Sequence, residues 1–361
     1  MIPVISGLFR FHLPGTTQRK VGRAFLVNSI IIQLTIKYSS LFFIKKLKIL
    51  LIIMIVMLKN RSIISISDLS DEDMNEVFSQ ADRMLENVDA GKKMNIMSSK
   101  ILATLFYEPS TRTRLSFESS MQRLGGSVIS MADSKTSSTI KGETLADTIR
   151  IVESYSDIIV IRHPLEGAAL LASRFSSKPV INAGDGSGEH PTQTLIDLYT
   201  VRKELGLIDG KTVTIIGDLK YGRTVHSLLS GLSRFDVEVN LVSPENLAIP
   251  KHVYNDVLGK LDIHVSTSLD EFLGETDILY VTRIQKERFT DKNEYAKLIG
   301  SYKITSKEVQ KLKPGSIIMH PLPRVDEISP EVDNTKAAKY FKQAYYGVPI
   351  RMALISMIAG D

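Results

Sequence analysis

Residues 106–114 read Phe106-Tyr107-Glu108-Pro109-Ser110-Thr111-Arg112-Thr113-Arg114. A mostly apolar run, 101–105, precedes this stretch and apolar residues recur at helical spacing after it, so the pattern predicts a strand, a turn and a helix. The start of a helix presents backbone N–H groups that have no partner within the helix. Hydroxyl and guanidinium groups add further donors and positive charge here, so the turn is suited to a phosphate. The alternative is a capped surface helix whose arginines are solvated.

Strand and helix patterns alternate along the chain, as they do in parallel α/β sheets. The first series occupies residues 100–182, and a second series begins at 213–217 and ends at 316–320. Between the two, residues 206–210 begin and end with glycine and interrupt the pattern, and a helical pattern over 336–358 closes the chain. We therefore expect an α/β protein with two domains, each a mostly parallel sheet flanked by helices.

The composition is that of a globular protein. The chain has 361 residues, 43% of them hydrophobic and 24% charged, which is enough for a large core and two domains. There is no cysteine, which excludes disulfides, a thiolate nucleophile and cysteine-bound zinc or iron–sulfur clusters. This composition is compatible with a cytoplasmic protein, and we expect that location.

The net charge of +5 comes from the N-terminal segment. Residues 1–61 carry ten of the 45 Lys and Arg residues, and the first acidic residue of the chain is Asp68. The remainder has 35 basic and 40 acidic residues, a net charge of −5. The sequence therefore gives no support for nucleic-acid binding by the body of the protein.

Residues 1–56 differ from the rest, because they are basic, free of acidic residues and rich in Ile, Leu and Phe. Their apolar run, continued to residue 58, has only ten residues, whereas a membrane-spanning helix needs about 20, and no cleavage site of the secretory type follows. Our preferred interpretation is that translation starts near Met54 or Met57. The alternatives are a disordered or surface-lying extension and a membrane-targeting segment.

Gly217, Asp218 and Gly222 follow a predicted strand and raise the alternative of a dinucleotide-binding loop. The Gly-x-Gly-x-x-Gly spacing of such loops is absent, and Arg223 lies in the turn. We therefore expect no nicotinamide or flavin cofactor.

The 106–114 stretch resembles the carbamoyl-phosphate-binding motif of the aspartate/ornithine transcarbamoylase family, and further segments match that family in the same order. They are Lys141-Gly142-Glu143-Thr144, Arg162-His163-Pro164, His190-Pro191-Thr192-Gln193, Gly222-Arg223-Thr224-Val225-His226-Ser227, Thr282-Arg283-Ile284-Gln285-Lys286-Glu287-Arg288 and His320-Pro321-Leu322-Pro323-Arg324. The resemblance extends from about residue 60 to the C-terminus. One such segment is weak support, but seven in register are specific.

The resemblance implies a domain organisation. Residues 57–195 with 336–361 would form a carbamoyl-phosphate-binding domain, onto which the C-terminal helix packs back. Residues 196–335 would form an aspartate-binding domain. Closure of the two domains around both substrates is expected, because each substrate contacts mainly one of them.

The reaction that the resemblance implies is transfer of the carbamoyl group of carbamoyl phosphate to the α-amine of L-aspartate, an early step of pyrimidine biosynthesis. Such a reaction needs orientation and stabilisation of negative charge rather than a nucleophile, metal ion or cofactor from the protein. The family's pattern assigns carbamoyl phosphate to Ser110, Thr111, Arg112, Thr113, Ser137, Lys141, Arg162, His190, Gln193, Leu322 and Pro323. The residues closest to the chemistry would be Arg112, Thr113, Lys141, Arg162 and His190, with the histidine donating to the carbonyl oxygen. The alternatives at these positions are structural ion pairs and a structural histidine.

Ser137 and Lys141 lie on a polar loop that, in the family, reaches into the active site of a neighbouring subunit. If this holds, the protein is a homotrimer with shared sites, and a monomer is inactive. Some members also bind a separate regulatory chain that carries zinc on cysteines, which this chain cannot be. An ordinary solvated loop is the alternative.

The acceptor would be aspartate rather than ornithine. Arg223, Arg283, Gln285 and Lys141 would bind the carboxylates of aspartate, and guanidinium groups suit carboxylates. Ornithine-specific members typically have a cysteine beside the Leu-Pro turn, where this chain reads His320-Pro321-Leu322-Pro323. Arg283 and Lys286 would also repel an ornithinium group. Glu108, Tyr221 and His226 are expected to support the site from outside it. A non-catalytic scaffold is the remaining alternative, against which stands the full set of expected basic residues.

Overall fold

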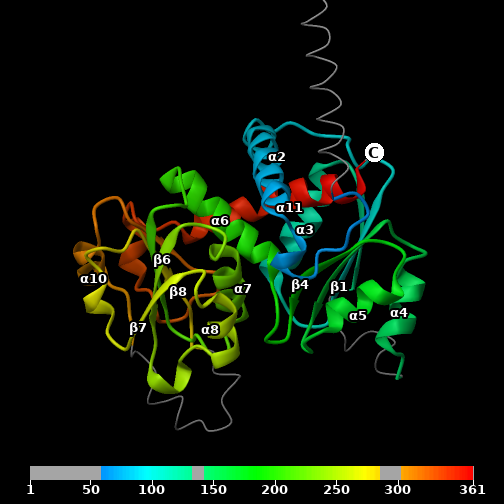
Figure 1. The fold of residues 1–361 in the computed structure, drawn as a ribbon. Coiled ribbons are helices and arrows are strands. Elements are labelled where there is room, and N and C mark those ends of the chain that lie inside the picture. Colours follow the sequence, from blue (N-terminus) through cyan, green and yellow to red (C-terminus); the bar gives the residue numbers. More distant parts are fainter. Residues whose placement is uncertain (1–57, 132–141, 285–301, 361) are drawn as a thin grey trace, which may run out of the picture. The chain divides into compact units, whose positions relative to one another are not determined.

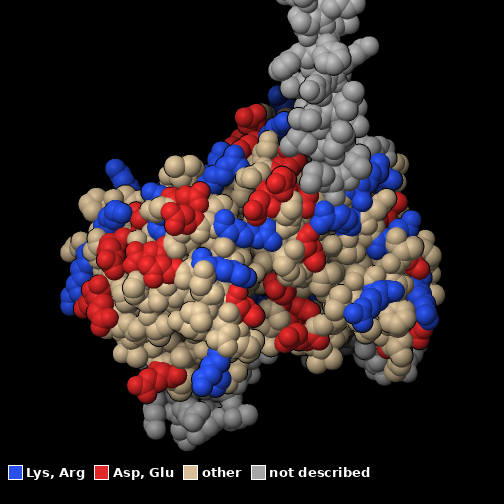
Figure 2. All heavy atoms as spheres, in the orientation of Figure 1, with Lys and Arg blue, Asp and Glu red and all other residues tan. Residues whose placement is uncertain are grey.

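The computed structural model describes residues 58–131, 142–284 and 302–360 (Figure 1). Residues 58–361 form one compact unit. Within the described ranges, none of the helices combines the length and the apolar character that crossing a membrane requires. On the face seen in Figure 2, basic and acidic side chains are interspersed.

The first sheet has four parallel strands in the order β2-β1-β3-β4. Their bounds are Ile101–Phe106 (β1), Ser127–Met131 (β2), Ile158–His163 (β3) and Val180–Asp185 (β4). The helices of this half that follow its strands are α3 (Thr111–Arg123), α4 (Leu145–Val152) and α5 (Ala168–Phe175). β1 and β3 are almost wholly buried, whereas β2 lies at the edge and is largely exposed.

The second sheet has five parallel strands in the order β7-β6-β5-β8-β9. Their bounds are Lys211–Ile216 (β5), Val237–Val242 (β6), Asp262–Ser266 (β7), Ile278–Val281 (β8) and Ile317–Met319 (β9). The helices are α7 (Arg223–Leu232), α8 (Lys251–Val257) and α10 (Ser306–Lys311), with 3₁₀ turns η4 (Glu245–Leu247), η5 (Leu269–Glu271) and η7 (Pro330–Asn334). The predicted fold class, two parallel sheets flanked by helices, is confirmed.

Three helices join the two halves: α2 (Asp71–Asp89), α6 (Pro191–Leu205) and the C-terminal α11 (Tyr340–Ala359). A 3₁₀ turn, η1 (Ile66–Asp68), precedes α2, which begins with a capping box in which Ser70 and Asp73 each bond the other's backbone N–H. The last helix packs against α2, α3 and α6, so the expectation that it returns to the first domain is confirmed. It begins at residue 340 rather than 336, because residues 337–339 hydrogen-bond along β9 instead.

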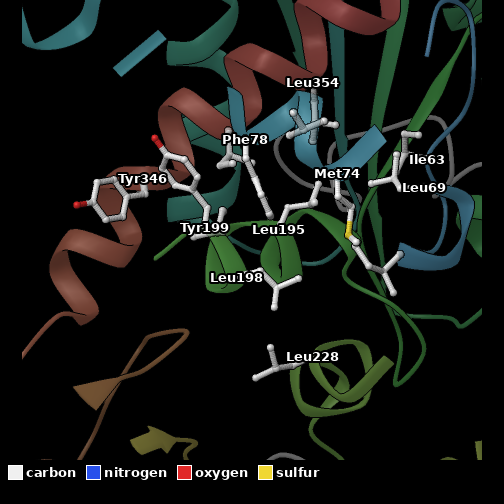
Figure 3. Close-up of a cluster of buried hydrophobic side chains, with 14 of the residues drawn as sticks. Ile63, Leu69, Met74, Phe78, Leu195, Leu198, Tyr199, Leu228, Tyr346 and Leu354 are labelled. Atoms are coloured by element: carbon white, nitrogen blue, oxygen red, sulfur yellow. The ribbon is translucent and has the colours of Figure 1, made fainter. Parts of the chain in front are cut away.

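One hydrophobic core runs through both halves. In Figure 3, Phe78 of α2, Leu195 and Tyr199 of α6, and Leu354 of α11 lie together. The same cluster continues to Leu228 of α7 in the second half. The middle of α6, residues 194–201, is buried on every side, as expected for a helix at the centre of a core. The two halves therefore share a common support.

The end of β5 meets the end of β8 at Gly217. This glycine has a φ of +124°, and an added Cβ would lie 2.2 Å from the carbonyl oxygen of Thr282. A hydrogen bond also connects the residues after β5 to those after β8, because the Asp218 N–H donates to Thr282 Oγ1 at 3.1 Å. Only glycine satisfies both the backbone angle and the space at this position.

Gly217→Ala should lower the free energy of unfolding by about 3 kcal/mol, because backbone strain and a collision with main-chain atoms add. The control is Gly206→Ala, at a φ of +85° with open space around it, where only the backbone strain of about 1 kcal/mol applies. Urea unfolding at a single protein concentration measures both. Equal losses in the two variants would contradict the role of the β5–β8 contact.

Candidate active site

A cavity of about 670 Å³ lies where the strands of both sheets end. Residues that follow β1, β3, β4, β5, β8 and β9 all line it, as expected for ligand sites of open α/β sheets. It brings together every predicted site residue in the described ranges: Ser110, Thr111, Arg112, Thr113, Arg162, His190, Gln193, Arg223, Arg283, Leu322 and Pro323. Ser137, Lys141 and Gln285 lie outside the described residues.

The first wall of the cavity is the start of α3. Ser110 is the N-cap residue, but its side chain makes no capping bond, so its hydroxyl stays available beside the helix N-terminus. Thr113 is buried and Arg112 is exposed towards the cavity. Partial burial and the charge of Arg283 lower the pKa of Arg112. An anion between these two guanidinium groups would relieve their repulsion.

A carboxylate holds two further arginines together. Glu108 Oε1 accepts from Arg162 at 2.7 Å and from Arg223 at 3.1 Å. Burial raises the pKa of Glu108, but the charges of the two arginines outweigh it and hold the pKa below its usual value. Burial, helped by Arg223, lowers the pKa of Arg162 to about 10. Because Arg162 belongs to β3 and Arg223 to α7, the ion pairs join the two halves across the cavity.

The side chain of Arg162 has one hydrogen-bond donor without a partner among the described residues. Its Nη1 donates to the carbonyl oxygen of Ala183 at 3.2 Å, whereas its Nε is buried and has no hydrogen-bond partner among the described residues. A buried donor of this kind costs free energy unless a ligand or water satisfies it. The arrangement is typical of a residue that completes its bonds with a ligand.

His190 is buried between β4 and α6, with 3% of its surface exposed. Its backbone N–H donates to Ser227 Oγ at 3.0 Å, and that hydroxyl donates to Glu189 at 2.6 Å, which fixes the histidine in place. Burial lowers the pKa of His190 well below its usual value, and Arg162, Arg223 and Arg351 lower it further. The imidazole is therefore neutral at neutral pH, with one nitrogen as donor.

The turn at residues 320–323 forms another wall. The Leu322 N–H donates to His320 Nδ1 at 2.7 Å, and His320 Nε2 pairs with Glu327 at 2.6 Å. The Leu322–Pro323 peptide bond is cis. The side-chain bonds hold the backbone carbonyls of the turn in a defined place beside the cavity.

Several residues of the cavity were not predicted from the sequence. Glu108, expected only as a supporting residue, lines it, whereas Tyr221 and His226 do not. The cavity also contains Ser116, Thr224, Thr282, His320, Gln343 and Arg351, none of which was assigned a role. The signal for Arg351 was present, because it is the one charged residue between 343 and 360 in an otherwise apolar helix.

Two family models match almost the whole described chain. The carbamoyl-P binding domain of aspartate/ornithine carbamoyltransferases matches residues 61–203, and their Asp/Orn binding domain matches residues 209–358. The chain belongs to the aspartate/ornithine carbamoyltransferase family. The first of these matches begins at residue 61. The segment before it therefore lies outside the part that this carbamoyltransferase shares with its family.

Individual members of the carbamoyltransferase family are close to this chain. The aspartate carbamoyltransferase catalytic subunit of Thermoplasma volcanium is 64% identical over 305 residues, which cover 84% of this chain and all of the relative. The catalytic subunit of M. jannaschii aspartate transcarbamoylase has a TM-score of 0.77 at 55% identity, covering 82% of this chain and 96% of its own. Aspartate transcarbamoylase of Trypanosoma cruzi, solved with carbamoyl phosphate and aspartate, has a TM-score of 0.81 at 42% identity, covering 85% and 99%.

The ring of His190 should stay neutral from about pH 8 down to about pH 6, because its environment disfavours the imidazolium. NMR of the protein with ¹³C-labelled histidine measures this, and the resonance lost in His190→Gln identifies the ring. The unfolded state binds the proton first, so the contribution of His190 to stability is present above its unfolded pKa of about 6.5 and falls as the pH drops through that value. A titration of this resonance near pH 6.5 would contradict the described environment.

Proposed function

We propose that this chain catalyses transfer of the carbamoyl group of carbamoyl phosphate to the α-amine of L-aspartate, giving N-carbamoyl-L-aspartate and phosphate. The observation that carries the proposal is the charge of the cavity. Five arginines line it, Arg112, Arg162, Arg223, Arg283 and Arg351, against one carboxylate among the described lining residues, Glu108. Two substrates that together carry a phosphate and two carboxylates match such a cavity.

The relatives support the same reaction. Those that match this chain at 62–66% identity over 305 residues are aspartate carbamoyltransferase catalytic subunits, and the T. cruzi enzyme has been solved with carbamoyl aspartate and phosphate as well as with both substrates. A match at this identity over the whole length of these catalytic subunits favours a working enzyme over a non-catalytic scaffold.

Carbamoyl phosphate binds to the side of the cavity that the first sheet and its helices form. Ser110, Thr111, Arg112 and Thr113 at the start of α3 bind the phosphate, and Arg162 reaches both the phosphate and the carbonyl oxygen. The side chain of Ser110, which makes no capping bond, and the Nε of Arg162, which has no hydrogen-bond partner among the described residues, support these roles. When the amine attacks, a C–N bond forms and the carbonyl oxygen gains negative charge. Collapse breaks the C–O bond and expels phosphate, which takes up the proton that the attacking nitrogen loses and whose remaining charge Arg112 stabilises.

His190 donates a hydrogen bond to the carbonyl oxygen as its charge grows. A neutral imidazole does so without adding a proton that the reaction does not need. Gln193 and the backbone carbonyls of Leu322 and Pro323 bind the carbamoyl amino group. Their position around one cavity supports this assignment.

The second half of the cavity binds the acceptor. Arg223 and Arg283 follow strands of the second sheet and pair with the two carboxylates of aspartate, with Gln285 assisting. A cationic acceptor such as ornithine would face the same arginines and be repelled. We accordingly assign carbamoyl phosphate to residues 57–195 with 336–361 and aspartate to residues 196–335.

We also propose a homotrimer in which Ser137 and Lys141 complete the site of a neighbouring subunit. Segment 132–141 follows β2, which lies at the edge of its sheet and on which Ile129 exposes 38% of its surface. Leu115, on helix α3 that packs against β2, exposes 51%. Among the described lining residues, neither neighbour of that segment, Met131 or Gly142, is found. An apolar edge beside the segment supports a subunit contact there. A cytoplasmic location and a separate regulatory chain remain predictions from the resemblance.

The purified full chain should form carbamoyl-aspartate from carbamoyl phosphate and L-aspartate, and no carbamoyl-ornithine when L-ornithine replaces the aspartate. The chain started at Met57 should give the same result, because the family matches begin after it. Product chromatography with both acceptors decides the matter. Carbamoyl-ornithine would overturn the assignment of the second half, and no product from a folded protein would favour the scaffold alternative.

Arg112→Ala and Lys141→Ala should each lower kcat by about 10³-fold, because each removes a cation that stabilises charge in the transition state. Mixing the two variants under conditions that exchange subunits should restore about a quarter of the parent activity, since each mixed trimer contains one intact shared site. Undiminished turnover by Arg112→Ala alone would contradict the assignment of Arg112 to the phosphate. Mixtures without activity would show that Lys141 serves its own subunit.

A further inference from the structure

A buried carboxylate beside the cavity has no role in the reaction as proposed. Asp197 of α6 has 1% of its surface exposed and accepts three hydrogen bonds. Gln193 Nε2 and Gln343 Nε2 donate to its Oδ1 at 2.8 and 2.6 Å, and Tyr280 Oη donates to its Oδ2 at 2.8 Å. Both glutamines line the cavity, whereas Asp197 itself lies behind them.

The backbone N–H of His320 determines which atoms donate and which accept in these hydrogen bonds. The His320 N–H can only donate, and it donates to Gln343 Oε1 at 2.8 Å. Gln343 must therefore turn its NH2 group towards Asp197, so that Oδ1 is an acceptor. Gln193, which meets the same oxygen, must also present its NH2 group to Asp197. Its amide oxygen is then the end left for the cavity.

We propose that Asp197 is a positioning residue that fixes the amide oxygen of Gln193 as an acceptor for the amino group of the donor substrate, and so selects carbamoyl phosphate over acyl phosphates. The proposal rests on the proposed function. An amino group donates to this oxygen, whereas the methyl group of acetyl phosphate leaves it without a partner. A site built to hydrogen-bond a substrate N–H discriminates strongly against an analogue that lacks it.

The direction of the Gln193 amide depends on Oδ1 of Asp197 as an acceptor and not on the negative charge of the carboxylate. Burial raises the pKa of Asp197 to about 7, against the hydrogen bonds of its three partners. Arg351 of α11 is the charged group that acts on Asp197, and Tyr280 of β8, whose pKa burial raises well above its usual value, is its titratable neighbour. Because Oδ1 already accepts two N–H groups, a proton is taken up on Oδ2, where the hydroxyl of Tyr280 turns to accept it. The two amides keep their directions.

Two variants at position 197 separate the oxygen from the charge. Asp197→Asn keeps an oxygen at the Oδ1 position, with its NH2 group donating to Tyr280, so the direction of Gln193 is preserved. Asp197→Leu, of similar size, removes the oxygen and releases the Gln193 amide. Calorimetric titration of the full chain with carbamoyl phosphate and with acetyl phosphate measures both dissociation constants without requiring turnover.

The parent should bind carbamoyl phosphate more tightly than acetyl phosphate. Asp197→Asn should leave both dissociation constants within about threefold, whereas Asp197→Leu should weaken carbamoyl phosphate by about tenfold and leave acetyl phosphate within about threefold. Asp197→Ala carries the same expectation if the leucine variant does not fold. A control away from the cavity is Asp82→Leu, because Asp82 also accepts from a buried tyrosine, Tyr199 Oη, at 2.8 Å, besides its ion pairs with Arg202 and Lys203. It should change neither constant.

Equal weakening of both ligands in Asp197→Leu would overturn the proposal, because it would show a general loss of structure. A parent without preference for carbamoyl phosphate, or an asparagine variant as weak as the leucine variant, would overturn it as well. A parent that prefers carbamoyl phosphate yet forms no carbamoyl-aspartate would contradict the proposed function alone.

Discussion

The rest of the structure depends on one constraint, the mutual repulsion of the guanidinium groups that line the cavity. Five arginines around one cavity oppose one another, and Arg162 and Arg351 are also largely removed from water. Burial lowers the pKa of Arg351 to about 9. Glu108 neutralises only part of this charge, by pairing with Arg162 and Arg223. Because Glu108 is the one carboxylate among the described lining residues, positive charge prevails around the cavity and favours the binding of an anion there.

A cavity with such internal repulsion needs rigid walls. The walls come from elements that end at the same place, because parallel strands bring their carboxyl ends to one edge. Behind them lies the common core of α2, α6 and α11, which extends to α7. Ser116 accepts from Arg351 Nη1 at 2.6 Å, so that even the buried arginine ties α11 to α3. Packing thus holds in place charges that would otherwise separate.

Much of this arrangement follows from the sequence. Strand, turn and helix around residue 106 predict the phosphate end, and the alternation of apolar runs predicts both sheets. Arg162 and Arg283 are located by the ends of predicted strands, one in each sheet, because ligands of open α/β sheets bind at the carboxyl ends of the strands. Gln343 and Arg351 could not be placed in this way. They lie on the C-terminal helix, and which of its faces meets the cavity depends on long-range packing that no local period reveals. In the sequence, Asp197 has the pattern of an ordinary solvent-exposed carboxylate on a helix. Only its burial among three hydrogen-bond donors, seen in the structure, distinguishes it from one.

The C-terminal helix has a further consequence for how the protein is made. The first sheet and its helices precede the second half in the chain, yet α11, which follows the second half, packs against α2, α3 and α6. The Asn60 N–H also bonds the carbonyl oxygen of Ile358, so the two ends of the described chain meet. During synthesis the apolar surfaces of α2, α3 and α6 that α11 covers therefore stay uncovered until residues 340–359 have left the ribosome. The half that is translated first is the half that is completed last.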